Sequence, residues 1–360
     1  LEMLPYIDFH PDVINCNDWQ TAMVPVYYSV FYANNDWYKG IKTVFTIHNI
    51  QYQGKYGPEL LEDVLGIPQN QASVLEYDNC VNMMKGAIET ANRVTTVSPT
   101  YAQEIMDPWF SHGMDGILRQ RSWKLSGILN GIDVAGYDPA TDKDIYAPFT
   151  VDDLSGKAVN KAELQKRLNL EERPDVPLIG MVTRMVSHKG LDLVKETLDQ
   201  LMWENDIQFV ILGSGDYEYE TFFRQMQDKY PGRLCACFGF VPELSRKIYA
   251  GADIFLMPSK SEPCGLSQMI ALRYGTIPVV RETGGLKDSI QDSGDGCGNG
   301  FTFQSYNGGD MLYAIHRALE GYANQEGWEI LVKRAMECDN SWGRSANAYI
   351  RLYRELIKEG

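Results

Sequence analysis

The sequence has few of the residues that build metal sites or disulfide frameworks. Its 360 residues include only seven cysteines and five histidines, with no C-x-x-C pair and no H-E-x-x-H motif. Most of the cysteines lie inside apolar runs such as RLCACFGF, as is usual for reduced thiols in a cytoplasmic protein. We therefore expect a cytoplasmic location, no disulfide framework, no metal and no cofactor.

Long apolar runs and an excess of positive charge are absent as well. No run approaches the about 18 residues of a membrane span, and no signal peptide opens the sequence. Lysine and arginine number 33 against 48 aspartates and glutamates, which gives a net charge of −15. A surface that acidic repels phosphate backbones and anionic lipids, so we expect neither nucleic acid nor a membrane as a partner. A small-molecule enzyme is the class that remains.

Short β-rich runs alternate with amphipathic stretches along the chain, a pattern typical of parallel sheets built from βαβ units. A turn-rich stretch at residues 129–144 has the composition of a linker between two domains. The strand candidates are residues 13–16, 43–48, 94–98 and 126–130 before the linker, and residues 178–183, 208–212, 234–238, 253–258, 277–281 and 300–303 after it. The helix candidates include residues 77–91, 157–170, 266–274 and 344–358.

These elements predict an α/β fold with two Rossmann-like, doubly wound domains. The second domain has six strand candidates, whereas the first has four and lacks a glycine-rich first βα turn, so we expect the first to be incomplete. We place the partial amino-terminal domain at residues 1–135 and the nucleotide-type domain at residues 136–343. The helix at residues 344–360 is expected to pack back on the first domain.

Parallel sheets bind ligands beyond the carboxyl ends of their strands, so the residues there are the first candidates for a site. Arg184 and Lys189 share the segment TRMVSHKG, which leaves a strand and enters a helix. Two cations beside a helix N-terminus suit a diphosphate, although a solvated loop would carry the same charges.

Three further loops follow strand candidates in the second part. Glu262, in SEPCGL, either hydrogen-bonds sugar hydroxyls and balances a developing cation or caps the helix expected at residues 266–274. The TGGL segment at residues 283–286 either admits a phosphate or forms a plain turn. The GSGD segment at residues 213–216 lacks a full G-x-G-x-x-G and is weak evidence alone.

Three other residues have a structural interpretation that the sequence alone favours. His48 ends the strand candidate TVFTIH, where a satisfied structural histidine is more common than a catalytic one. Asp18 could cap a helix beginning near Gln20. Cys264 has no histidine near it in the sequence, which favours a buried, inert thiol over a nucleophile.

Five long motifs nevertheless resemble bacterial glycogen synthases and plant starch synthases. They are VFTIHNIQYQG, ANRVTTVSPTYAQEI, ILNGIDVAGYDPATD, KSEPCGLSQMIALRYGTIPVVRETGGLKDSI and SWGRSANAYIRLYREL, in this order along essentially the whole chain. The resemblance implies the GT-B fold, with two Rossmann-like domains facing a cleft, and a bacterial cytosolic setting. It further implies transfer of glucose from ADP-glucose, with retention and without a metal, to the non-reducing end of an α-1,4-glucan. It leaves the oligomeric state open.

The resemblance also implies roles for individual residues. Arg184 and Lys189 match the pair that neutralises the leaving diphosphate, and Glu262 matches the acid that contacts the donor glucose and supports an oxocarbenium-like transition state. The catalytic residues implied are Glu262, His48, Asp18, Arg184 and Lys189. The donor and nucleotide site implied consists of Arg184, Lys189, Gly213, Gly215, Phe240, Cys264, Gly265, Leu266, Thr283, Gly284, Gly285 and Leu286, with the ring of Phe240 against adenine and residues 283–286 receiving the distal phosphate.

The chain departs from the family pattern in several places. Gln20 stands where a histidine is common, Ser261 where a phenylalanine is frequent, and Glu282 where an arginine is frequent. The K-x-G-G-L loop that reaches the donor phosphates is absent from these residues. The resemblance therefore implies an amino-terminally truncated synthase that binds nucleotide but is weakly active or inactive alone. The alternatives are another GT-B sugar-nucleotide transferase, or a binding-only nucleotide module.

Overall fold

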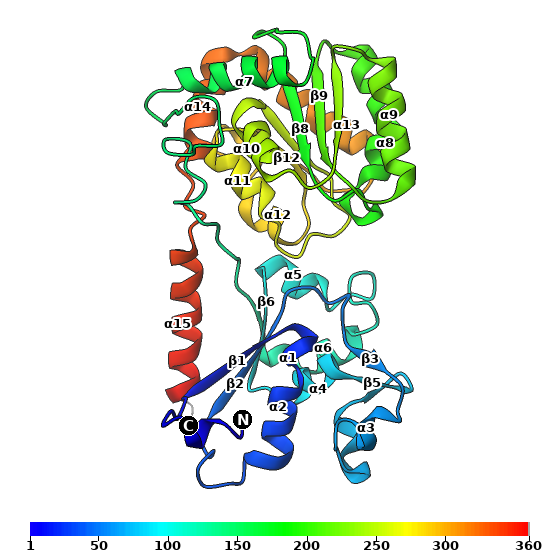
Figure 1. The fold of residues 1–360 in the computed structure, drawn as a ribbon, viewed down its shortest axis with the longest axis vertical. Coiled ribbons are helices and arrows are strands. Elements are labelled where there is room, and N and C mark those ends of the chain that lie inside the picture. Colours follow the sequence, from blue (N-terminus) through cyan, green and yellow to red (C-terminus); the bar gives the residue numbers. More distant parts are fainter. Residues whose placement is uncertain (359–360) are drawn as a thin grey trace. The chain divides into compact units, whose positions relative to one another are not determined.

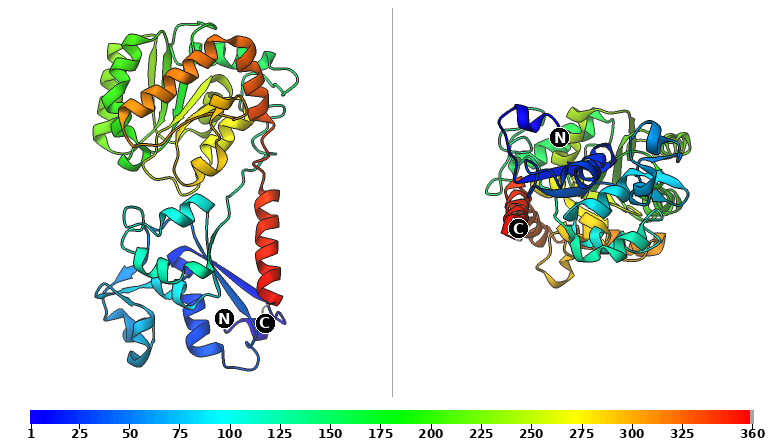
Figure 2. Two further views of the ribbon diagram at one scale, coloured as in Figure 1. Left: turned by 180° about the vertical axis from the view of Figure 1, so that it is seen from behind. Right: turned by 90° about the horizontal axis from the view of Figure 1, so that it is seen from below.

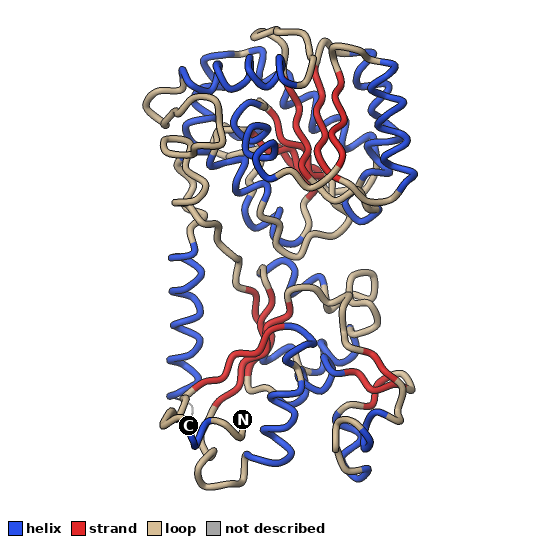
Figure 3. Tube along the Cα trace, in the orientation of Figure 1, coloured by secondary structure: helices blue, strands red, loops and turns tan. Residues whose placement is uncertain are grey.

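The computed structural model describes residues 1–358 and divides into two compact units (Figure 1). Unit 1 consists of Leu1–Asn130 and the carboxy-terminal segment from Gly343 on, and unit 2 is Gly131–Trp342. Each unit is built on its own parallel sheet, which Figure 3 shows in red. The predicted α/β class with two parallel-sheet domains is therefore confirmed.

The sheet of unit 1 contains the four strands expected from the sequence. They are β1 (Val13–Asn17), β2 (Lys42–Ile47), β6 (Arg93–Thr96) and β7 (Leu125–Gly127), in the spatial order β1-β2-β6-β7 and all parallel. The apolar run of β2 is buried on both faces, with Val44, Phe45 and Ile47 fully inaccessible, as central strands of parallel sheets usually are. Thr46 and Thr95 join β2 to β6 through their hydroxyls, 2.8 Å apart.

Short helices and a small antiparallel sheet complete unit 1. The sheet has the order β3-β5-β4, from β3 (Lys55–Tyr56), β4 (Glu76–Tyr77) and β5 (Cys80–Asn82). The helices are α1 (Asp18–Thr21), α2 (Met23–Tyr27), α3 (Leu60–Asp63), α4 (Met83–Thr90), α5 (Pro99–Glu104), α6 (Asp115–Gln120) and the carboxy-terminal α15 (Trp342–Lys358). The lower end of α15 lies near β1 in Figure 1. The Tyr353 hydroxyl of α15 donates to Asn15 Oδ1 of β1 at 3.2 Å.

The helix predicted at residues 77–91 is wrong in its first six residues. Residues Asp78 and Asn79 have φ of 51° and 57°, and they form a two-residue turn in which Tyr77 pairs with Cys80. Positive φ at both central residues is the geometry of a type I′ hairpin, and asparagine and aspartate tolerate it best. The chain becomes helical only after Asn82, whose side chain accepts the N–H of Lys85.

Unit 2 is a complete doubly wound domain. Its six strands are β8 (Leu178–Val182), β9 (Gln208–Gly213), β10 (Leu234–Phe238), β11 (Ile254–Met257), β12 (Ile277–Arg281) and β13 (Phe301–Phe303). Their spatial order is β10-β9-β8-β11-β12-β13, all parallel. This is the 3-2-1-4-5-6 order of dinucleotide-type folds, in which the winding direction reverses between the first and fourth strands, here β8 and β11.

Helices cover both faces of this sheet. They are α7 (Ser155–Arg167), α8 (Leu191–Glu204), α9 (Tyr217–Lys229), α10 (Pro242–Gly251), α11 (Ser267–Arg273), α12 (Gly284–Ser289), α13 (Gly308–Ala323) and α14 (Gln325–Met336). Helices α10 and α11 lie over the face seen in Figure 1, and α13 crosses the opposite face, seen in Figure 2. One core cluster between the sheet and helices α7 and α10 contains Leu164, Val210 and Ile248.

Candidate active site

The candidate donor residues gather where the winding of unit 2 reverses. The loop after β8 carries Arg184 and Lys189, and the loop after β11 carries Glu262. Since β8 and β11 are hydrogen-bonded neighbours, their carboxyl ends lie side by side, and the loops that follow them begin next to each other. A crevice at such a point is the usual ligand site of open α/β sheets.

Lys189 and Glu262 form a nearly buried ion pair. The ammonium of Lys189 donates to Glu262 Oε1 at 2.9 Å and to Oε2 at 2.7 Å, and the Ser259 hydroxyl adds a bond of 2.9 Å to Oε2. Only 6% of Glu262 is exposed. The alternative that Glu262 caps α11 is wrong, because no side chain caps that helix. Ser259 was not among the predicted site residues, and its place three residues before Glu262 was the only signal for it.

Arg184 supplies an exposed positive charge next to this pair. Its side chain reaches His188, with 3.5 Å between Nη2 and Nε2. Burial lowers the pKa of His188, and the nearby charges of Lys189 and Arg184 lower it further, so the imidazole stays neutral at neutral pH. Glu262 and Asp216 act on His188 in the opposite direction, so the two cations stand beside two carboxylates, and Glu262 is already paired with Lys189. Arg184 is thus the exposed cation of the group that an anion could meet, in a protein of net charge −15.

Glycines allow the loops of this site to approach one another. A Cβ on Gly190, where φ is +76°, would lie 2.0 Å from the carbonyl oxygen of Pro258 after β11. A Cβ on Gly213 would lie 1.8 Å from the Thr183 oxygen, and one on Gly215 would lie 2.3 Å from the Met185 oxygen. These glycines therefore hold the strand-end loops together, a requirement that exists whether or not a phosphate approaches them.

The TGGL segment lies against the Glu262 loop. The N–H of Gly285 donates to the carbonyl of Glu262 at 3.1 Å. A Cβ on Gly284 would lie 2.0 Å from that same oxygen, and one on Gly285 would lie 2.0 Å from the Cys264 oxygen. Thr283 is buried and α12 begins at the next residue. The segment is thus a close-packed neighbour of Glu262, at the end of the adjacent strand β12.

The remaining predicted donor residues differ in exposure. Cys264 is buried, as expected for an inert thiol, and Leu266 is 46% exposed. Gly265 has φ of +70°. Phe240, which follows β10, is 93% exposed. A phenyl ring left in solvent has its faces available for stacking.

A second group of predicted residues lies in unit 1, at the ends of β1 and β2. The Asp18 carboxylate accepts the backbone N–H of His48 at 2.8 Å, and His48 Nε2 lies 3.0 Å from Asn17 Oδ1. The interpretation of Asp18 as a cap for a helix near Gln20 is wrong, because α1 begins at Asp18 itself. Asp18 has φ of +54°, a conformation that costs free energy for any residue with a side chain. Strain of this kind is concentrated at functional sites.

Sites of other kinds have little support in residues 1–358. Within that part of the chain no group of three or more histidine, cysteine, aspartate or glutamate side chains is placed to hold a metal ion. None of the helices described there is both long and apolar enough to cross a bilayer.

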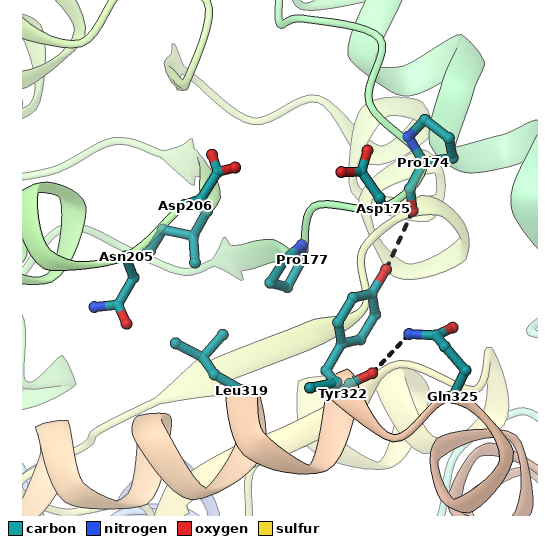
Figure 4. Close-up of a pocket in the computed structure, with 10 residues that line it drawn as sticks. Pro174, Asp175, Pro177, Asn205, Asp206, Leu319, Tyr322 and Gln325 are labelled. Atoms are coloured by element: carbon teal, nitrogen blue, oxygen red, sulfur yellow. Dashed lines mark hydrogen bonds between the residues drawn. The ribbon is translucent and has the colours of Figure 1, made fainter.

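A separate hollow of about 670 Å³ lies at the opposite edge of the sheet of unit 2 (Figure 4). Its walls include Pro177 and Asn205, which precede β8 and β9, so it faces the amino ends of the strands. Tyr322 points across it and donates to the carbonyl of Pro174 at 3.3 Å. The hollow is therefore not part of the group around Glu262.

Comparison with known proteins relates both parts of the chain to sugar transferases. Residues 1–120 match the family model described as starch synthase catalytic domain, and residues 162–332 match that of glycosyl transferases group 1. The chain is 39% identical to the catalytic domain of starch synthase IV from Arabidopsis thaliana, solved with ADP and acarbose, with a TM-score of 0.90 over 99% of this chain and 75% of that one. Sucrose-phosphate synthase from Thermosynechococcus elongatus shares the fold at a TM-score of 0.60 and 18% identity, covering 100% of this chain and 79% of that one.

These similarities define the class first: the protein is a glycosyltransferase of the GT-B fold. Over 363 residues it is 50% identical to the glycogen synthase of Geobacillus thermodenitrificans, an alignment of 100% of this chain with 75% of the relative. It is 49% identical to that of Alkaliphilus metalliredigens, with 99% and 76% covered. The chain belongs to the glycogen synthase and starch synthase family.

Proposed function

We propose that the protein transfers glucose from ADP-glucose to the non-reducing end of an α-1,4-glucan, with retention at the anomeric carbon. The observation that carries the proposal is the buried Lys189–Glu262 pair beside exposed Arg184, at the reversal point of a dinucleotide-type sheet. Two further facts support it, namely the identity to glycogen synthases and the ADP in the similar starch synthase IV.

Arg184 and Lys189 are proposed to stabilise the leaving group. When the bond between the anomeric carbon and the phosphate oxygen breaks, negative charge develops on the diphosphate. Exposed Arg184 lies in the loop after β8, and Lys189 follows five residues later, shortly before α8 begins. Fixed cations aimed at developing charge stabilise the transition state without reorganisation. Residues 283–286, at the N-terminal end of α12, are proposed to receive the distal phosphate.

Glu262 is proposed to act on the donor glucose. Its carboxylate is fixed by Lys189 and Ser259, so it is held in one orientation before substrate arrives. A fixed negative charge near the anomeric centre balances the positive charge that the glucose ring acquires as the leaving group departs. His48 and Asp18 are proposed to act beside the reacting sugar, with the Asp18 carboxylate positioning the backbone of His48.

Phe240 is proposed to stack on the adenine ring. Stacking on one aromatic ring contributes on the order of 1 kcal/mol, which permits a preference for adenine but does not produce it alone. No metal or other cofactor is needed in this scheme, and the cytoplasm remains the predicted compartment.

Transfer of radiolabelled glucose to glycogen tests the proposal. We expect labelled glucose to be incorporated into glycogen from ADP-glucose, and less of it from UDP-glucose. The incorporated label should be in α-1,4 linkage. A protein that binds ADP but transfers no glucose even at full length would support a binding-only module instead. That these 360 residues alone bind nucleotide but transfer little glucose stays a prediction, and assaying them beside the full-length Geobacillus relative tests it.

A further inference from the structure

Two thiols lie side by side at the edge of the sheet of unit 2. Cys235 and Cys237 are two positions apart on β10, so their side chains point to the same face, and their Sγ atoms are 3.8 Å apart. Strand β10 is an edge strand whose ladder partner is β9, and the N–H of Ala236, between the two cysteines, donates to Gln227 Oε1 at 2.8 Å. No residue of the proposed transfer reaction uses this pair.

The surroundings of the pair favour reactivity over inertness. Both side chains are half-buried against the cluster beneath α7 and α10, so a small reagent can reach them. A hydrogen bond from Cys235 lowers the pKa of Cys237 overall, although burial raises it in part, and the positive charge of Arg167 adds a smaller lowering. Arg167 is itself paired with Glu243 at 3.0 Å, which moderates its effect. The thiolate is the nucleophilic form of cysteine, so Cys237 is the attacking residue of the two.

We propose that Cys235 and Cys237 are a redox site that closes reversibly to a disulfide under a peroxide. The Cys237 thiolate attacks a peroxide oxygen, the O–O bond breaks, and Cys237 becomes a sulfenic acid as the other oxygen leaves as water or alcohol. The Cys235 sulfur then attacks the Cys237 sulfur and expels the sulfenic oxygen as water. Two thiols lose two electrons and two protons in total, and the peroxide is the oxidant.

The bond would be strained. Two residues of an extended strand span about 6.6 Å between Cα atoms, near the upper limit for a disulfide, and the sulfurs must approach to about 2.05 Å. Strand β10 must therefore shorten locally. An edge strand has only one ladder partner to follow it, but the hydrogen bond from Ala236 to Gln227 must lengthen. Strained disulfides are easily reduced, and this is the property expected of a reversible site rather than a structural one.

The strain would reach the nucleotide site. Cys237 and Phe238 pair with Leu212 and Gly213 of β9, and Phe240 follows two residues later. Resting on the proposed function, in which Phe240 stacks on adenine, we expect oxidation to weaken ADP binding several-fold.

Mass spectrometry of tryptic peptides tests the site. Cleavage after Arg233 and Arg246 releases residues 234–246, which contain both cysteines and no other. After mild treatment of the full chain with hydrogen peroxide, this peptide should lose the mass of two hydrogen atoms and regain it with dithiothreitol. Cys235→Ser and Cys237→Ser should abolish the loss, and Cys297→Ser, at an exposed thiol, should leave it unchanged. Two free thiols in the peptide after treatment, or direct conversion to sulfinic acid, would overturn the proposal.

Titration with ADP separates this inference from the proposed function. We expect the reduced chain to bind ADP and the oxidised chain to bind it less tightly. Equal affinity in the two forms would overturn the coupling to the nucleotide site. Failure of the reduced chain to bind ADP would count against the proposed function, while the peptide mass would still decide whether the disulfide forms.

Discussion

Glu262 has a partner for each of its carboxylate oxygens, so its negative charge is fixed before any substrate binds. Replacement by glutamine keeps the shape and removes the charge that we assign to the transition state. We expect Glu262→Gln to lower kcat about 100-fold or more without weakening ADP binding, because Lys189 loses its partner and becomes more available to phosphate.

The control for this prediction is Glu329→Gln, which removes the charge from an exposed ion pair to Lys333, at 2.6 Å within helix α14. Steady-state kinetics and ADP titration of both variants provide the readout. If Glu262→Gln keeps near-normal kcat and loses only thermal stability, Glu262 is a structural residue and the proposed role is wrong.

Asp18 combines a strained backbone with a hydrogen bond to the end of β2. Asparagine tolerates φ near +54° and offers the same acceptor oxygen, whereas alanine offers neither advantage. We expect Asp18→Ala to destabilise unit 1 by about 2 kcal/mol and Asp18→Asn to leave stability nearly unchanged. Both variants should lower transfer activity, because both remove the negative charge of Asp18. Thermal unfolding and activity are measured together, and equal stability losses in the two variants would contradict this account.

Among the elements, the loops after β8 and β11 depend on a close approach at Gly190. Gly296 has nearly the same φ, +78° against +76°, but open space around its Cβ position. Alanine at either position carries the cost of the left-handed backbone, and only Gly190→Ala adds a clash with the Pro258 carbonyl. We expect Gly190→Ala to lower the free energy of unfolding by at least about 2 kcal/mol more than Gly296→Ala, measured by denaturant titration. Equal losses would mean that the two loops do not touch as described.

Strand β13 and helix α13 are joined by Asp292, which accepts two hydrogen bonds from Arg317, at 2.7 and 2.9 Å. Burial raises the pKa of Asp292, but these bonds and the N–H groups of Thr302 and Gly294 lower it overall, to about 2, from 3.8. A carboxyl with a lowered pKa in the folded state stabilises the fold above pH 4, and that stabilisation is lost as pH falls toward 2.

We therefore expect the difference in Tm between the wild type and Asp292→Asn to be largest near neutral pH and to shrink between pH 4 and pH 2. Asp228→Asn, at an exposed position of α9, should show no such dependence. A Tm difference independent of pH would show that Asp292 is not ionised in the folded protein.

How far the sequence predicts these elements depends on the range of the interactions that form them. The buried strands of both sheets follow from local apolar runs such as TVFTI and QFVILG, and all ten predicted strands are present. The turn at Asp78 was missed because residues 77–91 keep a helix-like spacing of apolar residues, which hides two positions of positive φ. The pairing of Lys189 with Glu262 spans 73 residues, and only the order of the strands in the sheet brings them together.

At the scale of the whole molecule, each unit contributes a distinct set of groups. Unit 2 has the complete six-stranded sheet and the group around Glu262, and unit 1 has the Asp18–His48 contact on a four-stranded sheet. The predicted site residues could be placed near strand ends from the sequence, because the carboxyl ends of parallel strands lie at the same edge of a sheet. It could not show that Asp18 holds His48 through a strained backbone, because that conformation depends on the neighbouring strand β2.

The most direct test of a donor site at the β8–β11 reversal point is calorimetric titration of the 360-residue chain with ADP. We expect measurable binding, and a loss of about tenfold or more in Arg184→Ala, because a charged hydrogen bond to phosphate is removed. Arg173→Ala should bind ADP as the wild type does, since Arg173 pairs with Asp175 and Asp206 at the opposite edge of the same sheet. Absence of ADP binding, or a loss in Arg173→Ala with none in Arg184→Ala, would contradict the account.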